Sequence, residues 1–287
     1  MKKKNNILLS LIVMVAAFVL VACGSGSSSE GEDALAKIKD AGVLNIGTSP
    51  DYPPMEFYVL DDNGDRQIAG MDIDLANGIA NEIGVELNIT TTDFDGVLAN
   101  VQSGSVDMGI TGFTFTEARA EVMQFSDGYL QESDLGFQGI MMLSETAEQF
   151  ASLDEIKEAD LTLGSQTGSI QYELAGGLTD SSNIRQYGTL DVGLAALNQG
   201  DIDGMVVATS SAEPMLLTFP DLVILPKENF DLDPEGLYST NSIALPLGEE
   251  YDSLMEVVNK VINENIENGN MAKWHAENVE LSRQAVE

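Results

Sequence analysis

From Asp33 onward the sequence alternates short β-rich runs with amphipathic helical segments. The runs predicted to be strands are Val43–Gly47, Val85–Ile89, Val106–Thr111, Leu161–Gly164, Ile184–Tyr187 and Asp203–Val207. The segments predicted to be helices hold Leu75, Ile79, Ala80 and Ile83 before Gly84, then Val97–Val101, Leu190–Asn198, and a last long helix from about Tyr251 to Glu267. Alternation of strands and helices favours parallel sheets covered by helices.

One acidic loop briefly suggests a calcium site. Asp61–Asp65 starts like an EF-hand loop, which needs Gly at its sixth position and Glu at its twelfth. Those positions hold Arg66 and Asp72, so the motif fails. Asn63-Gly64 instead predicts the turn of a β-hairpin between Tyr58–Leu60 and Gln67–Ala69.

The composition excludes several function classes. The chain has 13 basic and 47 acidic residues, with a formal net charge of -34, so it repels nucleic acid phosphates. Cys23 is the single Cys and His275 the single His, which argues against imidazole metal sites and against Ser-His-Asp or Cys-His catalysis. No phosphate loop or dinucleotide fingerprint occurs, and we expect neither a cofactor nor a metal.

The first 22 residues predict a secretory signal peptide. A basic head, Met1–Lys4, precedes an apolar stretch from Ile7 to Ala22 that only Ser10 interrupts. This stretch is shorter than the roughly 20 residues that a membrane-spanning helix needs. We therefore expect residues 1–22 to be removed from the mature protein.

Cys23 lies where a lipid anchor would be attached. Leu20–Cys23 resembles the lipobox of bacterial lipoproteins, whose Cys thiol is diacylated before cleavage on its N-terminal side. The alternative is a buried structural Cys, but Gly24–Ser29 is too small and flexible a tract to bury it. We expect residues 23–33 to be the lipidated Cys and a flexible tether, which holds the protein on the extracellular side of the cell membrane.

Four segments with a shared spacing follow expected strands or open expected helices. In Thr48–Phe57, two prolines fix the backbone and leave Tyr52 at the carboxyl end of a strand, where α/β folds bind ligands. The other three are Gly70–Leu75, Thr111–Arg119 with its continuation Phe125–Tyr129, and Gly164–Gln171.

On these four segments, in this order, the chain resembles the polar amino acid family of extracellular solute-binding proteins of ABC transporters, from about Asp33 to Glu280. The resemblance implies an α/β, two-lobed periplasmic-binding-protein-like fold of type II, with two Rossmann-like α/β lobes joined by two crossing strands. It places the crossings near Tyr129–Ser133 and Leu237–Asn241. Lobe 1 then holds residues 34–129 and 241–287, and lobe 2 holds residues 130–240.

The resemblance also implies the ligand site. An amino acid carboxylate suits the fork of an Arg, and of the four Arg in the chain, Arg119 matches the family's carboxylate clamp. The remaining matches are positions that hydrogen-bond the ligand or its carboxylate (the Gly112 carbonyl, Thr114 and Ser169) and aromatic walls (Tyr52 and Phe94). Gln166 and Gln171 are further candidates, whose amides either contact the ligand or face solvent. Arg119 as a surface residue paired with Glu, and Phe94 as a core residue, are the alternatives.

The sequence departs from the family at the ammonium of the ligand. Many relatives carry an acid where this chain has Ala208, and some carry Asp where it has Ser49. A buried ammonium without a carboxylate partner would be costly. Either Asp51 or Glu213 reaches the ligand, or hydroxyls and carbonyls meet the ammonium, or the ligand is not an ordinary α-amino acid.

The resemblance implies a lipid-anchored monomer that captures a small polar solute, an amino acid first of all, and delivers it to an ABC transporter permease. We expect no enzyme activity and no nucleic acid partner. Two alternatives remain. One is a cleft enzyme like the cyclohexadienyl dehydratases of this fold, and the other is a sensory domain. Sensors usually continue into a transmembrane helix, whereas this chain stops at Glu287.

Overall fold

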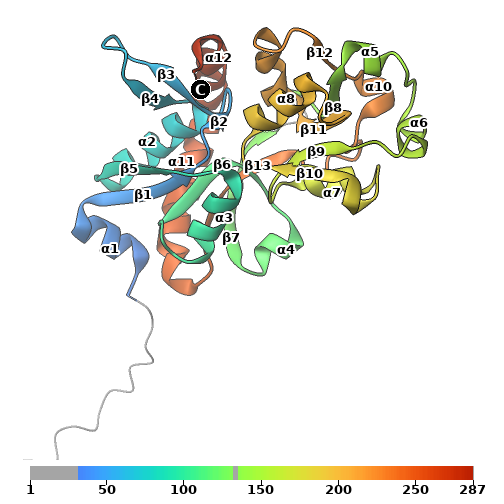
Figure 1. Ribbon diagram of the computed structural model, residues 1–287. Coiled ribbons are helices and arrows are strands. Elements are labelled where there is room, and N and C mark those ends of the chain that lie inside the picture. The colour runs from blue at the N-terminus through green and yellow to red at the C-terminus, as the bar shows by residue number, and fades with distance from the viewer. Residues whose placement is uncertain (1–31, 132–134, 287) are drawn as a thin grey trace, which may run out of the picture. The chain divides into compact units, whose positions relative to one another are not determined.

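The structure is a computed structural model that describes residues 32–131 and 135–286. Its strands form two five-stranded sheets and one small three-stranded sheet (Figure 1). The predicted signal peptide, Cys23 and most of the tether lie outside the described residues. Within the described part, no helix is both long enough and apolar enough to cross a membrane.

The first sheet has the strand order β5-β1-β6-β13-β7. β1 pairs in parallel with β5 and β6, whereas β13 runs antiparallel to both β6 and β7. The strands are β1 (Val43–Thr48), β5 (Glu86–Thr91), β6 (Met108–Thr114), β7 (Met123–Gln131) and β13 (Thr240–Pro246).

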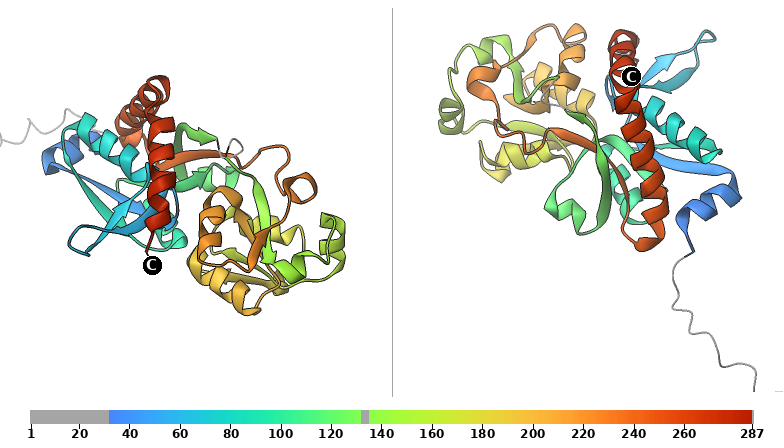
Figure 2. Two further views of the ribbon diagram at one scale, coloured as in Figure 1. Left: turned by 90° about the horizontal axis from the view of Figure 1, so that it is seen from above. Right: turned by 180° about the vertical axis from the view of Figure 1, so that it is seen from behind.

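Helices pack against both faces of the first sheet (Figure 2). Neighbouring residues of a strand point to opposite faces. Ile110 of β6 therefore joins the core beneath α2 (Met71–Ile83) and α11 (Asp252–Glu267), and Phe113 joins the core beneath α3 (Phe94–Gln102). The remaining helices of this part are α1 (Ala34–Ala41), α4 (Glu117–Ala120), η4 (Glu249–Tyr251), α12 (Asn270–Leu281) and η5 (Ser282–Gln284).

The predicted hairpin is confirmed. β3 (Glu56–Leu60) and β4 (Arg66–Ala69) pair antiparallel, and β2 (Asp51–Tyr52) adds the third strand of the small sheet. Gly64 lies in the connecting loop, where its N–H donates to the carbonyl oxygen of Asp61 at 2.9 Å.

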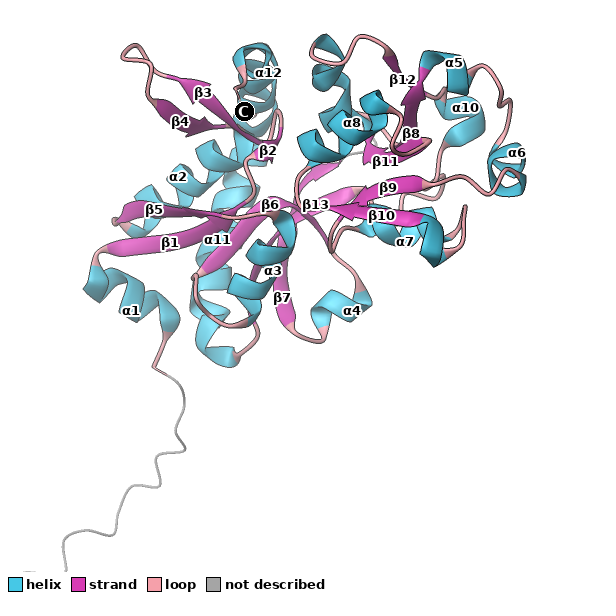
Figure 3. Cartoon of the chain, viewed as in Figure 1, coloured by secondary structure: helices cyan, strands magenta, loops and turns pink. Residues whose placement is uncertain are grey.

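The second sheet has the order β10-β9-β11-β8-β12 (Figure 3). β9 is parallel to β10 and β11, and β8 is antiparallel to β11 and β12. The strands are β8 (Gln138–Leu143), β9 (Leu163–Gln166), β10 (Ile184–Tyr187), β11 (Gly204–Ala208) and β12 (Leu222–Ile224).

Helices also pack against both faces of the second sheet, because β8 sends Ile140 and Met142 into one core and Met141 into the other. The helices are α5 (Ser144–Ala147), α6 (Leu153–Glu158), α7 (Ile170–Gly176), η2 (Ser181–Asn183), α8 (Leu190–Gln199), α9 (Thr209–Ala212), η3 (Glu213–Leu217) and α10 (Lys227–Phe230). The predicted fold class, with two α/β lobes, is confirmed.

The two crossings fall where the first sheet gives way to the second. β7 and β13 remain paired as far as Gln131 and Thr240, and the next strand after β7 is β8 of the second sheet. The first predicted crossing includes residues 132 and 133, which lie outside the described residues. The exact lobe boundaries stay a prediction.

One prediction about the C-terminal region is wrong. The helix ending at Glu267 is not the last long helix, because α12 follows it after Gly269, whose φ of +79° ends the preceding helical path. α12 packs Met271 and Trp274 on the core beneath α11. Most of its other residues are polar, so its apolar pattern is weak in the sequence.

Gly70 sets the start of α2 and with it the position of Asp72. Its φ is +136°, and an added Cβ would lie 1.9 Å from the carbonyl oxygen of Met55. This close approach lets the N–H of Asp72 donate to that same oxygen at 3.0 Å. A residue with a side chain could not take this backbone path without moving β3 or α2.

We predict that Gly70→Ala costs about 2–4 kcal/mol of unfolding free energy, because it combines backbone strain with a backbone clash. Gly64→Ala is the matched control, since Gly64 also has a positive φ of +83° but nothing within 4 Å of its Cβ position. The control should cost about 1–2 kcal/mol. Urea unfolding measures both, and equal costs would contradict the role of the clash.

Candidate functional site

The candidate site lies at the carboxyl ends of strands from both sheets. β6 ends at Thr114, and β9 of the second sheet ends at Gln166. Side chains and loops at these ends line a cavity of about 30 Å³. Ligand sites of open α/β sheets lie at such strand ends.

The structure brings all seven residues of the predicted ligand site into the lining of this cavity. They are Tyr52, Phe94, Gly112, Thr114, Arg119, Gln166 and Ser169. Gln171, the second amide considered from the sequence, lines it too. Their contact with a ligand stays a prediction.

Arg119 lies on the short helix α4, which Thr116 caps by accepting a hydrogen bond from the N–H of Arg119 at 3.1 Å. The guanidinium donates to the carbonyl oxygen of Thr114 at 2.7 Å and, in the other lobe, to that of Gly168 at 3.0 Å. Its carbon lies 5.4 Å from the centre of the Phe94 ring. Burial lowers the pKa of Arg119 to about 10, partly opposed by the charge of Glu173.

Arg119 therefore differs from an ordinary surface Arg. Among the described residues it makes no ion pair, since both of its hydrogen bonds go to carbonyl oxygens. The alternative pairing with a neighbouring Glu is absent there. A partly desolvated guanidinium without a carboxylate favours binding of an external anion.

Gly112 carries the backbone bend beside Arg119. Its φ is +56°, and an added Cβ would lie 2.8 Å from the ring of Tyr52, so the aromatic ring packs directly on the backbone. Phe94 proves to be both core and cavity wall, because its ring lies 5.2 Å from that of Phe113 while it lines the cavity. Ser169 donates its hydroxyl to the carbonyl oxygen of Gln166 at 2.7 Å.

Asp51 is the acidic residue in the cavity lining. Its carboxylate accepts hydrogen bonds from the hydroxyl of Ser49 at 2.6 Å, the amide of Gln166 at 2.9 Å and the N–H of Leu190 at 2.6 Å. Burial raises its pKa to about 6, although the hydrogen bonds from Ser49 and Leu190 oppose the shift. Ala208 is buried at the end of β11, and the exposed Glu213 is not part of the lining.

Sequence reasoning missed Asn241, which lies on β13 opposite Thr114. Its side chain is 2% exposed and lines the cavity, and its Nδ2 has no hydrogen-bond partner among the described residues. Gln138 was missed as well, and it accepts a hydrogen bond from Gln171 at 2.8 Å. The sequence feature that could have identified Asn241 is its polar side chain within a predicted crossing strand.

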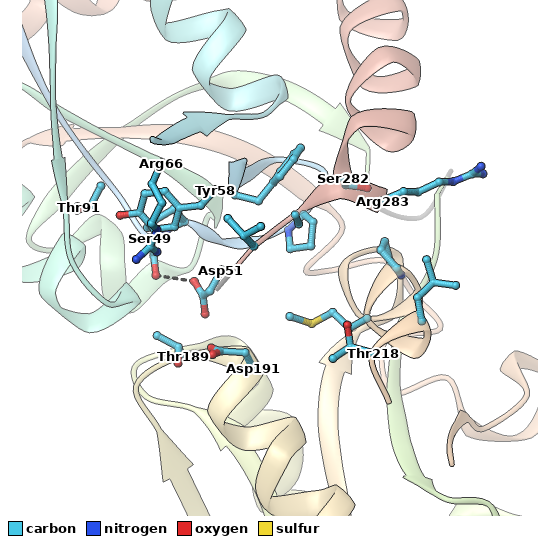
Figure 4. A pocket seen from close by; sticks show the side chains of 18 of the residues that line it. Ser49, Asp51, Tyr58, Arg66, Thr91, Thr189, Asp191, Thr218, Ser282 and Arg283 are labelled. Carbon is cyan, nitrogen blue, oxygen red and sulfur yellow. Dashed lines mark hydrogen bonds between the residues drawn. The ribbon is translucent and has the colours of Figure 1, made fainter. Parts of the chain in front are cut away.

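A second, larger cavity of about 430 Å³ adjoins the first, and Asp51 lines both. Figure 4 shows Asp51 and Ser49 on one wall, with Thr189 and Asp191 of the other lobe facing them. The carboxylate of Asp51 is therefore accessible from both cavities. Among the described residues, no cluster of three or more His, Cys, Asp or Glu could hold a metal ion.

A sequence model of the bacterial extracellular solute-binding proteins, family 3, matches residues 44–279. The chain belongs to this family. The family predicted from the four sequence segments is thereby confirmed.

Individual relatives of this solute-binding protein include two bacterial proteins. The arginine-binding extracellular protein ArtP of Bacillus subtilis is 34% identical over 166 residues, which are 58% of this chain and 57% of ArtP. A probable histidine-binding protein of Campylobacter jejuni is 26% identical over 260 residues, covering 91% of this chain and 93% of that protein.

A solved structure shares the fold. It is that of AbpA from Streptococcus pneumoniae, described as an amino acid ABC transporter substrate-binding protein bound to L-arginine. The TM-score is 0.75 at 29% identity, and the match covers 86% of this chain and 98% of AbpA.

We predict that the carboxyl of Asp51 titrates near pH 6. Because burial raises the folded-state pKa above its ordinary value of 3.8, the folded protein holds a proton that the unfolded chain releases. The stabilisation from the neutral carboxyl is complete below about pH 4 and is lost as the pH rises through about 6.

Carbon NMR of the Asp side chains gives the midpoint, and thermal unfolding gives the stability profile. Asp51→Asn should remove both features, whereas Asp62→Asn, the same charge change at an exposed loop position, should leave them in place. A midpoint near 4 for Asp51 would contradict the prediction.

Proposed function

We propose that this protein captures an amino acid at Arg119 and delivers it to an ABC transporter permease. The observation that carries the proposal is the pair of opposite charges in the cavity lining. Arg119 has no ion-pair partner among the described residues, and Asp51 is the lining carboxylate. A zwitterion with a carboxylate for Arg119 and an ammonium for Asp51 complements both.

We propose Asp51 as the partner of the ligand ammonium, because position 208 is Ala. Of the two acids that the sequence offered, Asp51 lines the cavity and Glu213 does not. Hydroxyl and amide groups around Asp51 already orient its carboxylate, so an incoming ammonium meets a fixed acceptor. An ammonium near this carboxylate would favour its ionised form and offset the desolvation.

The relatives support an amino acid as the ligand. Those reported above are described as arginine-binding, histidine-binding and bound to L-arginine. They do not favour the enzyme or sensor alternatives, because each is described as a binding protein. The description of AbpA as a substrate-binding protein of an ABC transporter supports the proposed permease partner.

We predict that Arg119→Ala weakens binding of the preferred amino acid by about 2–5 kcal/mol, because a desolvated carboxylate loses its partner. Arg119→Lys should recover part of the loss, since a point charge cannot form two parallel hydrogen bonds. Arg185→Ala, at an exposed position on β10, is the control that removes a positive charge elsewhere.

Calorimetric titration against the standard amino acids and their decarboxylated amines decides the matter. The parent should prefer the amino acid over the matching amine, and Arg119→Ala should lose this preference. If the folded Arg119→Ala variant binds as tightly as the parent, the cavity does not hold a carboxylate at Arg119.

The proposal includes a lipid anchor at Cys23, supported by the lipobox-like run Leu20–Cys23 and the tether that follows. We predict that the Cys23→Ser precursor is not lipid-modified and no longer partitions with membranes. Mass spectrometry and detergent-phase partitioning of both forms measure this. Equal partitioning of Cys23→Ser and the parent would overturn the anchor.

A further inference from the structure

Two buried carboxyl groups lie directly behind the ligand cavity. Glu56 belongs to β3 and Asp72 to the first turn of α2, and both side chains are 0% exposed. Neither residue lines the cavity, so neither can contact a ligand there. They nevertheless bind the backbone and side chains of the residues that do.

Each carboxyl accepts hydrogen bonds from the end of β6. The hydroxyl of Thr111 donates to Oε1 of Glu56, and Oδ2 of Asp72 accepts from the N–H of Gly112 at 3.1 Å. The same Oδ2 accepts from the hydroxyl of Tyr129 on β7 at 2.8 Å. The pair therefore connects β3, α2, β6 and β7 at one buried point.

The two carboxyl groups act on each other, and within the described part of the chain the second oxygen of each has no donor. Among the described residues, no N–H or O–H group donates to Oε2 of Glu56 or to Oδ1 of Asp72. The titratable groups outside the pair that act on it are Asp51 and Tyr129, and neither is a cation. Neither carboxyl has an ion-pair partner in the described ranges.

Two adjacent buried carboxyls without a cation cannot both ionise. Burial and the neighbouring charge of Asp72 raise the pKa of Glu56 well above its usual value. Burial also raises the pKa of Asp72, but the donors Tyr129 and Gly112 stabilise its ionised form. The proton thus belongs on Glu56, from which it bridges to Asp72.

We propose that Glu56 and Asp72 share one proton and act together as positioning residues that fix the Thr111–Gly112 backbone at the ligand cavity. With the proton in place, Oε2 of Glu56 donates to Oδ1 of Asp72, and every buried oxygen of the pair is satisfied. The location of the proton does not depend on the proposed function, whereas the effect on ligand binding rests on it.

Infrared spectroscopy tests the shared proton without any ligand. At about pH 8, where ordinary carboxyls are ionised, the parent should show the C=O stretch of a protonated carboxyl. Glu56→Gln should remove this band, because the proton lies on Glu56, whereas Asp72→Asn should shift its frequency, because Glu56 then loses its carboxylate acceptor. Glu86→Gln, at an exposed position on β5, should keep it. A parent without the band, a Glu56→Gln variant that retains it, or an Asp72→Asn variant with an unshifted band would overturn the assignment.

Hydrogen exchange of the Gly112 amide tests the positioning role. Asp72→Ala should speed this exchange at least about tenfold, whereas Asp72→Asn should restore slow exchange because its amide oxygen still accepts from Gly112. The amide of Val206 on β11 is the internal reference for overall unfolding. Unchanged Gly112 exchange in Asp72→Ala, or equal acceleration of Val206, would contradict the role.

If Asp72→Ala does not fold, Glu56→Ala against Glu56→Gln gives the same comparison, because Gln replaces the shared proton with an amide N–H. Titration with the amino acids of the panel above then measures the consequence for binding. If none of them binds the parent, the proposed function fails, while the infrared and exchange results still decide the present inference.

Discussion

The hydrogen bond from the Gly112 N–H to Asp72 fixes the backbone that lines the ligand cavity relative to the rest of the first lobe. It joins the end of β6 to the start of α2, and Tyr129 brings β7 to the same carboxylate. Asp72 can occupy this position because the backbone at Gly70 passes close to Met55. A glycine conformation outside the cavity thus determines the backbone within it.

Charge explains how a strongly acidic protein can take up a ligand with a carboxylate. A net charge of -34 repels free anions at long range, but an amino acid zwitterion has no net charge and is not repelled. In the proposed complex, its carboxylate meets the guanidinium of Arg119 and its ammonium meets Asp51, both of which line the cavity. Selection for a zwitterion therefore needs only two fixed groups.

The sequence predicted the features that arise from local patterns and a recognisable spacing. The α/β class, the hairpin and the family follow from such patterns, and the seven site residues all line one cavity. It did not predict contacts between distant segments. Asp51 meets Leu190 across 139 positions, and Asn241 reaches the cavity only because β13 pairs with β6. α12 was missed because its pattern is mostly polar.

The position of the carboxylate in the cavity depends on the folded backbone and not on sequence spacing alone. The hydroxyl of Ser49 donates to Asp51, two residues further on. Asp51 begins β2, and from there its carboxylate reaches Gln166 and the start of α8 in the other lobe. The cavity lining therefore holds a carboxylate although position 208 is Ala. That carboxylate belongs to Asp51 in the opposite lobe, and it is already hydrogen-bonded to groups of both lobes.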